Sequence, residues 1–578
     1  MAEQIVSPGV FTRENDQSFI TEGPIVAGAA IIGSTAKGPV EEPTLVSSFS
    51  DYTAKFGGAL ESSSRRYDFF TSIAAQNFFQ QGGDTLLVTR VVNNDYTAAS
   101  ATVQKGFSGT GASFTLKTIA KGKDQLSSGS TGGAPDANGI LPSGSADNIR
   151  FEITTVNTSS GVFNLLVRRG DDSTKEKVIL EQYLNVSLDP FSDNYIEKAI
   201  GNQTFTIATD DAGVNYLQIT GSYPNKSRYV IVGSVTTPTP NYLDAAGNIS
   251  SNAFTASLPS VQNGAFDAGG TGEPKAGAKF YQDIAVDNIQ GVEVDDYDAA
   301  ISLLSNKDLY NFGVLALPGL TANNTTHRSR YNSAITNAEE AGDNIVIVDP
   351  AAYGTTSTLT VVDNANQFNT SYAAAYWPWV QTQTPNTGEI VFVPASTFIP
   401  GVYAFNDNQR DPWFAPAGLQ RGALGGVIRA EKALTKANRD ALYEGRVNPI
   451  ATFSQQGVVV FGQKTLQKKS SALDRVNVRR LLIALKQFIG GVGRTLVFEQ
   501  NTTATRNAFL AQVNPYLESV QQRQGLFAFK VVMDDTNNTP DVVDRNQLVG
   551  QVFVQPAKTA EFVIIDFNIL PTGVEFPS

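Results

Sequence analysis

The stretch FFQQGGDTLLVTRVV, Phe78–Val92, decides how the first compact part of the chain folds. Apolar residues recur at helical spacing over 64–81, which predicts a helix there. The pair Gly82-Gly83 provides its end, because glycine readily adopts the backbone conformation that follows a helix. The apolar run over 85–92 then predicts a buried strand, so the whole unit is typical of an α/β fold.

The same alternation returns after residue 285. Helices are expected over 295–305 and 328–341, and apolar strands over 311–317 and 344–348. Because a helix that follows a strand usually leads to a neighbouring parallel strand, the sequence predicts a parallel sheet with helices on its faces.

A different composition separates these two α/β stretches. Gly, Ser, Thr, Asn and Asp dominate residues 96–280, and the apolar runs are short. Between clusters of turn-forming residues, short strands are predicted over 150–156, 161–168, 204–209, 216–221 and 228–235. We therefore expect an inserted β-rich domain, built as a barrel or a sandwich, that decorates an outer surface.

Two amphipathic helices are predicted in the C-terminal part, over 473–489 and 503–520, followed by strands over 527–532 and 550–554. On the first helix, a basic stripe lies beside the apolar face and consists of Arg475, Arg479 and Lys486. Residues 421–499 hold fourteen Lys and Arg but five Asp and Glu, although the whole chain carries a net charge of −12. This excess is either chance clustering on a solvated face or a basic surface that faces an acidic partner, such as another copy.

Both ends of the chain are predicted to be extended arms. Val10–Glu14 is short and compatible with a strand, with no partner strand beside it in the sequence. Residues 561–570 alternate at a period of two, and one face of the predicted strand carries Val563, Ile565, Phe567 and Ile569.

These patterns divide the chain into five predicted parts. They are an N-terminal arm (1–25), a discontinuous central α/β domain (26–95 and 281–455), the β-rich insertion (96–280), a C-terminal domain (456–560) and a C-terminal strand arm (561–578).

The residue inventory restricts the chemistry that the chain can perform. There is no cysteine, and the single histidine, His327, lies in a polar stretch that predicts a surface position. No phosphate-binding loop and no HExxH pattern occurs in the sequence. We therefore predict no catalytic, cofactor-binding or metal-binding residues and no enzyme activity.

The same inventory bears on partners and location. The sequence shows no secretory signal and no apolar run long enough to span a bilayer. The negative net charge disfavours direct binding to nucleic acid. We expect a soluble chain made in a cytoplasm.

Several stretches share one further pattern, in consistent order along the chain. They are SPGVFTRE (7–14), FFQQGGDTLLVTRVV (78–92), SYAAAYWPWV (371–380), VPAS (393–396), PGVYAFND (400–407), DPWFAPAG (411–418), VNVRRLL (476–482), FEQN (498–501) and PAKTAEFVII (556–565). Together they resemble the contractile tail sheath family of phages and related injection machines. No stretch of 96–280 contributes to the resemblance.

This resemblance implies a multidomain α+β fold, with a central α/β domain that is subtilisin-like in fold only. It implies a virion tail subunit, assembled in the host cytoplasm, that forms hexameric rings stacked around a tail tube. Contraction from a metastable extended state would drive the tube through the host envelope. Its partners would be other copies, the tube protein, and the baseplate and tail terminator proteins, with no cofactor.

The terminal strands and the basic stripe take roles in this expectation. Val10, Phe11 and Thr12 at one end, and Val563, Ile565, Phe567 and Ile569 at the other, would pair with a neighbour's sheet. Arg475, Arg479 and Lys486 would lie on the inner face, near the tube or an acidic patch of the sheath. Two alternatives stay open at this point: another self-assembling virion or surface-layer protein, and an α/β hydrolase.

Overall fold

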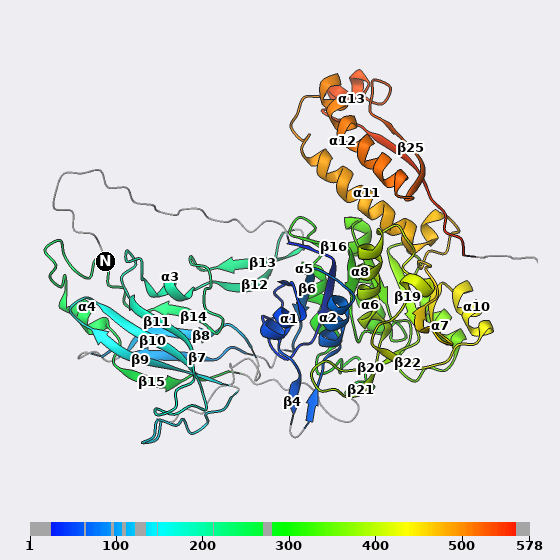
Figure 1. Ribbon diagram of the computed structural model, residues 1–578. Coiled ribbons are helices and arrows are strands. Elements are labelled where there is room, and N and C mark those ends of the chain that lie inside the picture. The colour runs from blue at the N-terminus through cyan, green and yellow to red at the C-terminus, as the bar shows by residue number, and fades with distance from the viewer. Residues whose placement is uncertain are drawn as a thin grey trace, which may run out of the picture.

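The computed structural model describes residues 25–62, 65–93, 97–106, 111–121, 135–146, 148–211, 213–269 and 280–561. These residues form a strand-rich part, a central α/β part and a C-terminal part with two long helices (Figure 1). The mixed α and β character predicted from the sequence is therefore confirmed. The predicted terminal strands lie outside the described residues, and with them Val10, Phe11, Thr12, Val563, Ile565, Phe567 and Ile569.

An eight-stranded sheet forms the centre, in the order β24-β23-β19-β18-β17-β2-β6-β3. Its strands are β2 (Ala29–Gly33), β3 (Thr44–Val46), β6 (Leu86–Arg90), β17 (Val314–Ala316), β18 (Ile345–Val348), β19 (Ala373–Trp377), β23 (Val447–Phe453) and β24 (Gly457–Val460). The inner strands are parallel, whereas β3 and β24 at the two edges run antiparallel to their neighbours. Strands buried on both faces are apolar throughout, as in the sequence IVIV of β18.

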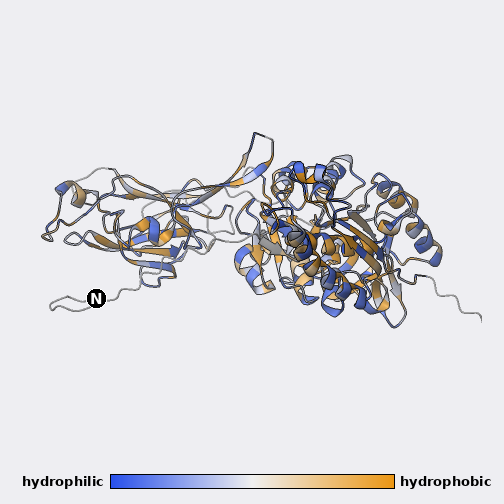
Figure 2. Ribbon diagram, turned by 90° about the horizontal axis from the view of Figure 1, so that it is seen from above, coloured by the Kyte–Doolittle hydropathy of each residue, from blue (hydrophilic) through white to orange (hydrophobic). Residues whose placement is uncertain are grey.

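Helices pack around this sheet, and Figure 2 shows the central strands largely in the apolar colours. The helices are α1 (Phe49–Phe56), α2 (Phe70–Gln80), α5 (Tyr297–Leu303), α6 (Thr325–Ala341), α7 (Thr358–Ala365), α8 (Ile399–Gln409) and α10 (Lys436–Glu444). Their buried side chains and those of the strands form one large hydrophobic cluster, the central cluster.

Two predicted elements differ from the structure because of strand pairing. The helix predicted over 64–81 begins only at Phe70, because Arg65–Tyr67 forms strand β5, which pairs with β4 (Leu60–Ser62). The strand predicted over 311–317 divides at Gly313 into β16 (Tyr310–Phe312) and β17. The division has a physical reason: β16 pairs with β1 (Ile25–Ala27), whereas β17 pairs with β2 and β18.

A small sheet in the order β21-β20-β22 flanks the central part. Its strands are β20 (Val380–Gln383), β21 (Ile390–Val393) and β22 (Val427–Ala430). Further short elements of the chain are α9 (Gly418–Arg421) and the 3-10 helices η2 (Val294–Asp296), η3 (Ala395–Thr397) and η4 (Ala472–Asp474). The buried carboxylate of Asp68 accepts hydrogen bonds from Asn386 and Thr387, which lie between β20 and β21. One carboxylate therefore holds this hairpin turn on the central part.

Two antiparallel sheets, β11-β10-β9-β15 and β14-β8-β7, make up the strand-rich part. Its elements are β7 (Ser100–Gln104), β8 (Ala112–Thr118), β9 (Ile149–Asn157), β10 (Val162–Arg169), β11 (Ile179–Ser187), β14 (Val230–Val235), β15 (Gln262–Ala265), α3 (Ile196–Ile200) and α4 (Asn252–Ser257). Side chains from both sheets share a second hydrophobic cluster, in which the rings of Phe114 and Phe163 stack at 5.6 Å.

A hairpin of β12 (Thr204–Thr209) and β13 (Asn215–Thr220) reaches from the strand-rich part toward the central part (Figure 1). Ile207 and Leu217 lie directly opposite each other in the hairpin. Both side chains pack against the central cluster. The hairpin is therefore a contact between the two parts in addition to the covalent connections.

The C-terminal part contains α11 (Val476–Arg494), α12 (Thr503–Gln522), β25 (Leu526–Val532), α13 (Pro540–Asp544) and β26 (Gln551–Pro556). Its apolar side chains form a third cluster, the C-terminal cluster. Both predicted helices are present, and α11 continues to Arg494 instead of ending at Ile489. Within the described part of the chain, no helix is both long and apolar enough to cross a membrane.

Candidate functional site

Helix α11 joins the C-terminal part to the central part. Val476 and Ile483 belong to the central cluster, whereas Leu481, Leu485 and Val492 belong to the C-terminal cluster. Residues seven apart share one face of a helix, so each cluster receives its own face of α11. The side chains of this one helix therefore decide how the two parts sit together.

Arg480 holds α11 on the central part. Its Nη1 donates to Oδ1 of Asp407 at 2.8 Å, and its guanidinium carbon lies 4.6 Å from the centre of the Tyr403 ring. Burial alone would lower the pKa of the guanidinium, but the charge and hydrogen bonds of Asp407, together with Tyr403 and Tyr376, raise it. The sequence pattern did not single out Arg480, although it lies within the shared stretch VNVRRLL.

Glu561, the last described residue, is held at the start of α11. Its carboxylate accepts hydrogen bonds from Nε of Arg475 at 2.6 Å, from the hydroxyl of Tyr443 at 2.8 Å and from Nε2 of Gln463 at 3.1 Å. Burial alone would raise the pKa of this carboxyl, but these hydrogen bonds outweigh burial and hold it below its usual value. The root of the C-terminal segment is thus fixed on the folded body as an ionised carboxylate.

The predicted basic stripe is mostly engaged within the chain. Arg475 binds Glu561, and the buried guanidinium of Arg479 lies 4.0 Å from the centre of the Tyr372 ring and donates to Oγ of Ser371. Lys486 is exposed, and its Nζ donates to the Tyr372 hydroxyl at 3.1 Å. Arg479 and Lys486 therefore converge on one tyrosine, and the buried charge of Arg479 is not offered to another molecule.

Strands β25 and β26 form a two-stranded antiparallel sheet, and within the described ranges each pairs only with the other. One face packs on the C-terminal cluster through Phe529, Val531, Val552 and Val554. On the strands themselves, Phe527 is 76% exposed and Phe553 is 56% exposed. A ribbon with unpaired outer edges and exposed aromatic side chains is open to pairing with further strands.

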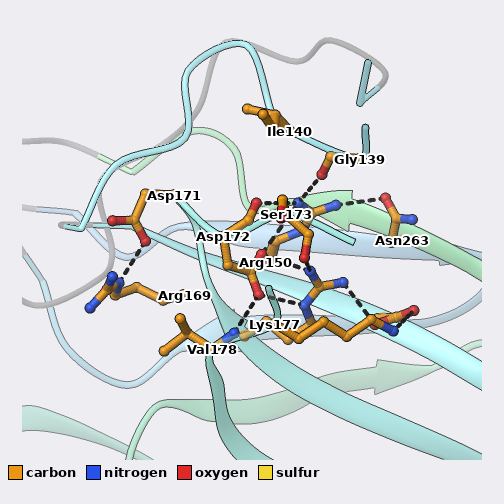
Figure 3. Close-up of polar contacts among 12 residues, drawn as sticks. Gly139, Ile140, Arg150, Arg169, Asp171, Asp172, Ser173, Lys177, Val178 and Asn263 are labelled. Atoms are coloured by element: carbon orange, nitrogen blue, oxygen red, sulfur yellow. Dashed lines mark hydrogen bonds and ion pairs between the residues drawn. The ribbon is translucent and has the colours of Figure 1, made fainter. Parts of the chain in front are cut away.

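A buried charged network ties the strand-rich part together (Figure 3). Arg168 donates to both carboxylate oxygens of Asp172, at 2.7 and 2.8 Å, and to Glu152 at 2.8 Å. Arg150 approaches the same Asp172 and donates to the backbone oxygen of Gly139 at 2.5 Å. Burial, followed by the nearby charge of Arg168, lowers the pKa of Arg150. The network fixes loops on the ends of β9 and β10, and no sequence pattern had indicated it.

His327 corrects the prediction of a surface position, because it is buried with 1% of its surface exposed. Helix α6 begins at Thr325, with Asn324 as its cap, whereas the predicted helix begins at residue 328. This earlier start turns His327 inward. Its Nδ1 accepts a hydrogen bond from the backbone N–H of Thr321 at 3.1 Å, and burial lowers its pKa. In a catalytic triad, a carboxylate lies at Nδ1 of the histidine. Here a backbone N–H lies at that nitrogen, so His327 is not arranged as the histidine of a triad.

Comparison with known proteins places this architecture in a family. Residues 290–466 match the phage tail sheath protein central domain, and residues 468–569 match the phage tail sheath C-terminal domain. The chain belongs to the phage tail sheath family. This is a family of phage tail proteins and not a family of enzymes.

Characterised tail sheath proteins align with part of the chain. That of Vibrio phage KVP40 is 38% identical over 221 residues, covering 38% of this chain and 33% of the relative. That of Enterobacteria phage T4 is 37% identical over 185 residues, covering 32% of this chain and 28% of the relative. The matching segment thus spans about a third of the length of these tail sheath proteins.

The fold is similar to that of a solved sheath tail protein from Listeria innocua, with a TM-score of 0.51. The likeness covers 92% of this chain and 95% of the other, at 11% sequence identity. At this level of identity, the comparison concerns the fold alone.

Proposed function

We propose that the chain is the repeating subunit of a contractile tail sheath. Copies form hexameric rings that stack helically around the tail tube, between the baseplate and the tail terminator. The sheath changes from a metastable extended state to a compact state and drives the tube through the host envelope. The subunit resides in the virion tail and assembles in the host cytoplasm.

The ribbon of β25 and β26 is the observation that carries this proposal. It has two outer edges that no other described strand occupies, and the chain has two terminal segments with strand patterns. Val10–Thr12 of one copy and Val563–Ile569 of another would extend the ribbon on neighbouring subunits. Backbone pairing of this kind holds copies together while the rest of each subunit changes its orientation.

The hydrophobic clusters support three of the five parts expected from the sequence, although β24, just beyond the expected boundary at residue 455, belongs to the central sheet. The strand-rich part has its own cluster, the central part has another, and the C-terminal part has the third. We propose arms at 1–25 and 561–578, a central domain at 26–95 and 281–455 that is subtilisin-like in fold only, an inserted domain at 96–280 and a C-terminal domain at 456–560.

The basic excess of residues 421–499 supports a role for the C-terminal domain on the inner face. The sequence carries no phosphate-binding loop, so contraction would draw on free energy stored in the assembled lattice. In the predicted stripe, Lys486 is the exposed member and is therefore our candidate for contact with the tube or with an acidic patch of a neighbouring copy.

Electron microscopy of the purified chain tests the proposal. We expect hollow, cross-striated tubes of uniform diameter. Flat lattices would instead indicate a surface-layer protein, and particles that remain monomeric at high concentration would contradict self-assembly. Deletion of residues 1–24 or of residues 562–578 should leave folded monomers that form no connected sheath. Sheaths that still assemble and contract without a terminal segment would overturn the strand-donation mechanism.

A further inference from the structure

The C-terminal part contains an apolar groove that the proposed function does not use. Its volume is about 940 Å³. The described residues that line it include Ile489, Leu496, Phe509, Met533, Val543 and Val552. Four amide side chains, Gln500, Asn501, Asn546 and Gln547, also line the groove, and Glu499 is the single charged residue among this described lining. The groove therefore suits an uncharged segment that carries both apolar and polar side chains.

The rim of the groove carries exposed apolar side chains. Val497 is 59% exposed, and Phe498 is fully exposed with a φ of 71°, a left-handed conformation that is unusual for an aromatic residue. Backbone strain at an exposed aromatic residue is typical of a site that binds something. The rim therefore presents two large apolar side chains that a bound segment could cover.

The described chain begins at β1, close to the half of α11 that carries this groove. Strand β1, which follows the segment, pairs with β16 in the register Val26↔Asn311. Oδ1 of Asn311 accepts a hydrogen bond from Nε2 of Gln487 at 3.2 Å. Gln487 lies two residues before Ile489, which lines the groove, so β16 is beside the half of α11 that carries it. The preceding twenty-four residues can extend roughly 80 Å, which is ample.

The composition of the segment fits the groove. Gln4–Thr12, with the sequence QIVSPGVFT, has no charged residue and includes Ile5, Val6, Val10 and Phe11. The C-terminal segment starts at Glu561, which Arg475 holds at the other end of α11, and its apolar run is interrupted by the charge of Asp566, so it is the less suitable occupant. The nineteen residues of that helix separate the two ends by roughly 28 Å.

We propose that the groove binds the chain's own N-terminal segment, residues 1–24, before the subunit joins an assembly. Val10 and Phe11 occupy the apolar lining, and a neighbouring copy later takes the segment as a strand. The docking stands on the groove alone, whereas this second step rests on the proposed function. Storage of the segment within its own subunit hinders uncontrolled strand exchange between free copies.

Disulfide trapping tests the docking, because the chain has no cysteine of its own. The double variant Val10→Cys with Val543→Cys is oxidised as a dilute monomer and examined by non-reducing electrophoresis and mass spectrometry. The expected product is an intramolecular disulfide. A second pair, Val10→Cys with Gly550→Cys, guards against a local effect at position 543, since a side chain at Gly550 meets only ordinary contacts with Met533.

Two controls make the result specific. The pair Val10→Cys with Asp211→Cys, which places the second thiol on the exposed turn of the β12–β13 hairpin, should remain reduced. Adding Phe11→Asp to the groove pairs should lower the yield of intramolecular disulfide about tenfold, because an apolar anchor is lost. Intermolecular disulfides alone, no disulfide, or trapping of Ile565→Cys in place of Val10→Cys would overturn the proposal. Failure of wild-type sheath assembly would bear only on the proposed function.

Discussion

Arg475 and Glu561 are joined by two parallel hydrogen bonds, from Nε to Oε1 at 2.6 Å and from Nη2 to Oε2 at 2.9 Å. This is the two-pronged geometry in which a guanidinium binds a carboxylate most strongly. The pair lies where α11 begins and where the described chain ends. The start of the helix and the root of the C-terminal segment therefore share one contact.

Replacement of Glu561 by Gln keeps the size of the side chain but removes its charge. We expect a loss of stability of about 1–2 kcal/mol, as for a half-buried charged hydrogen bond. A double-mutant cycle with Arg475→Gln, followed by thermal unfolding, measures the coupling; additive effects would contradict it. Because the pKa of Glu561 is lowered in the folded state, its contribution is present above the ordinary carboxyl pKa of about 4.3 and is lost as the pH falls through the lower folded value.

Asp172→Asn should destabilise the strand-rich part by about 3–5 kcal/mol, because two buried guanidinium groups lose their shared carboxylate. Thermal unfolding followed by limited proteolysis of residues 97–269 measures the loss. Asp171→Asn is the matched control, since Asp171 pairs with Arg169 at the surface and its substitution should change stability little. Equal effects of the two substitutions would show that the network in Figure 3 contributes nothing special.

Asp349 is expected to make stability depend on pH near neutrality. Burial raises the pKa of its carboxyl to about 7, from about 3.9 in an unfolded chain. Between these values the folded state holds a proton that the unfolded state has released, so stability falls as the pH rises and levels off above the folded pKa. Asp349→Asn should weaken this decrease while keeping an acceptor for the backbone N–H of Ser396.

Unfolding temperatures at about pH 6 and about pH 8 check this expectation. His327 acts in the opposite direction below its ordinary pKa of about 6.5, because its folded pKa is lowered, so the comparison is made between variants and not between pH values alone. The control is Asp363→Asn, at an exposed position on α7. An unchanged pH profile in Asp349→Asn would contradict the assignment.

Phe527→Lys should impair assembly without unfolding the subunit. The ring is 76% exposed on β25, so its loss removes little burial within the subunit, whereas a charge there disfavours an apolar contact with a neighbour. Sheath length in micrographs and the melting temperature of the monomer are the two readouts. Leu359→Lys, at a residue 69% exposed on α7, is the control for the added charge. Normal sheaths from Phe527→Lys would argue against a role for this face.

Substitutions of Arg479 and Lys486, the two cations that contact Tyr372, should distinguish an effect on folding from an effect on assembly. Arg479→Glu places a carboxylate in a buried site and should destabilise the chain by about 3 kcal/mol or more. Lys486→Glu, at an exposed position, should leave the fold intact and weaken assembly on tubes, since the charge of the inner face is reversed. Co-sedimentation with purified tubes tests this, and unchanged binding by Lys486→Glu would remove Lys486 from the inner face.

Local periodicity predicted the elements that carry their own pattern. The helices α11 and α12 and the strands β6 and β18 are present because apolar spacing or an unbroken apolar run specifies each of them. The pattern also gave the mixed fold. The pattern predicted the ends of helices less well. An example is the start of α6, where the cap Asn324 turns His327 inward.

Several buried or half-buried polar contacts join partners far apart in the sequence. Glu561 meets Arg475 and Tyr443 across separations of 86 and 118 residues. Arg150 reaches Asn263, a separation of 113 residues. Nothing in the spacing of a single chain specifies such pairs, because they arise only when separate elements pack together.

The β12–β13 hairpin has a consequence for movement. Ile207 and Leu217 press on the central part, so the strand-rich part is braced there as well as joined by its two chain connections. A contact beside the chain connections restricts rotation of the strand-rich part relative to the central part. We therefore expect the two parts to turn together, with the strand-rich part as a lever. A small rotation of each subunit about the axis of a sheath would sweep the far end of that lever through a much longer arc.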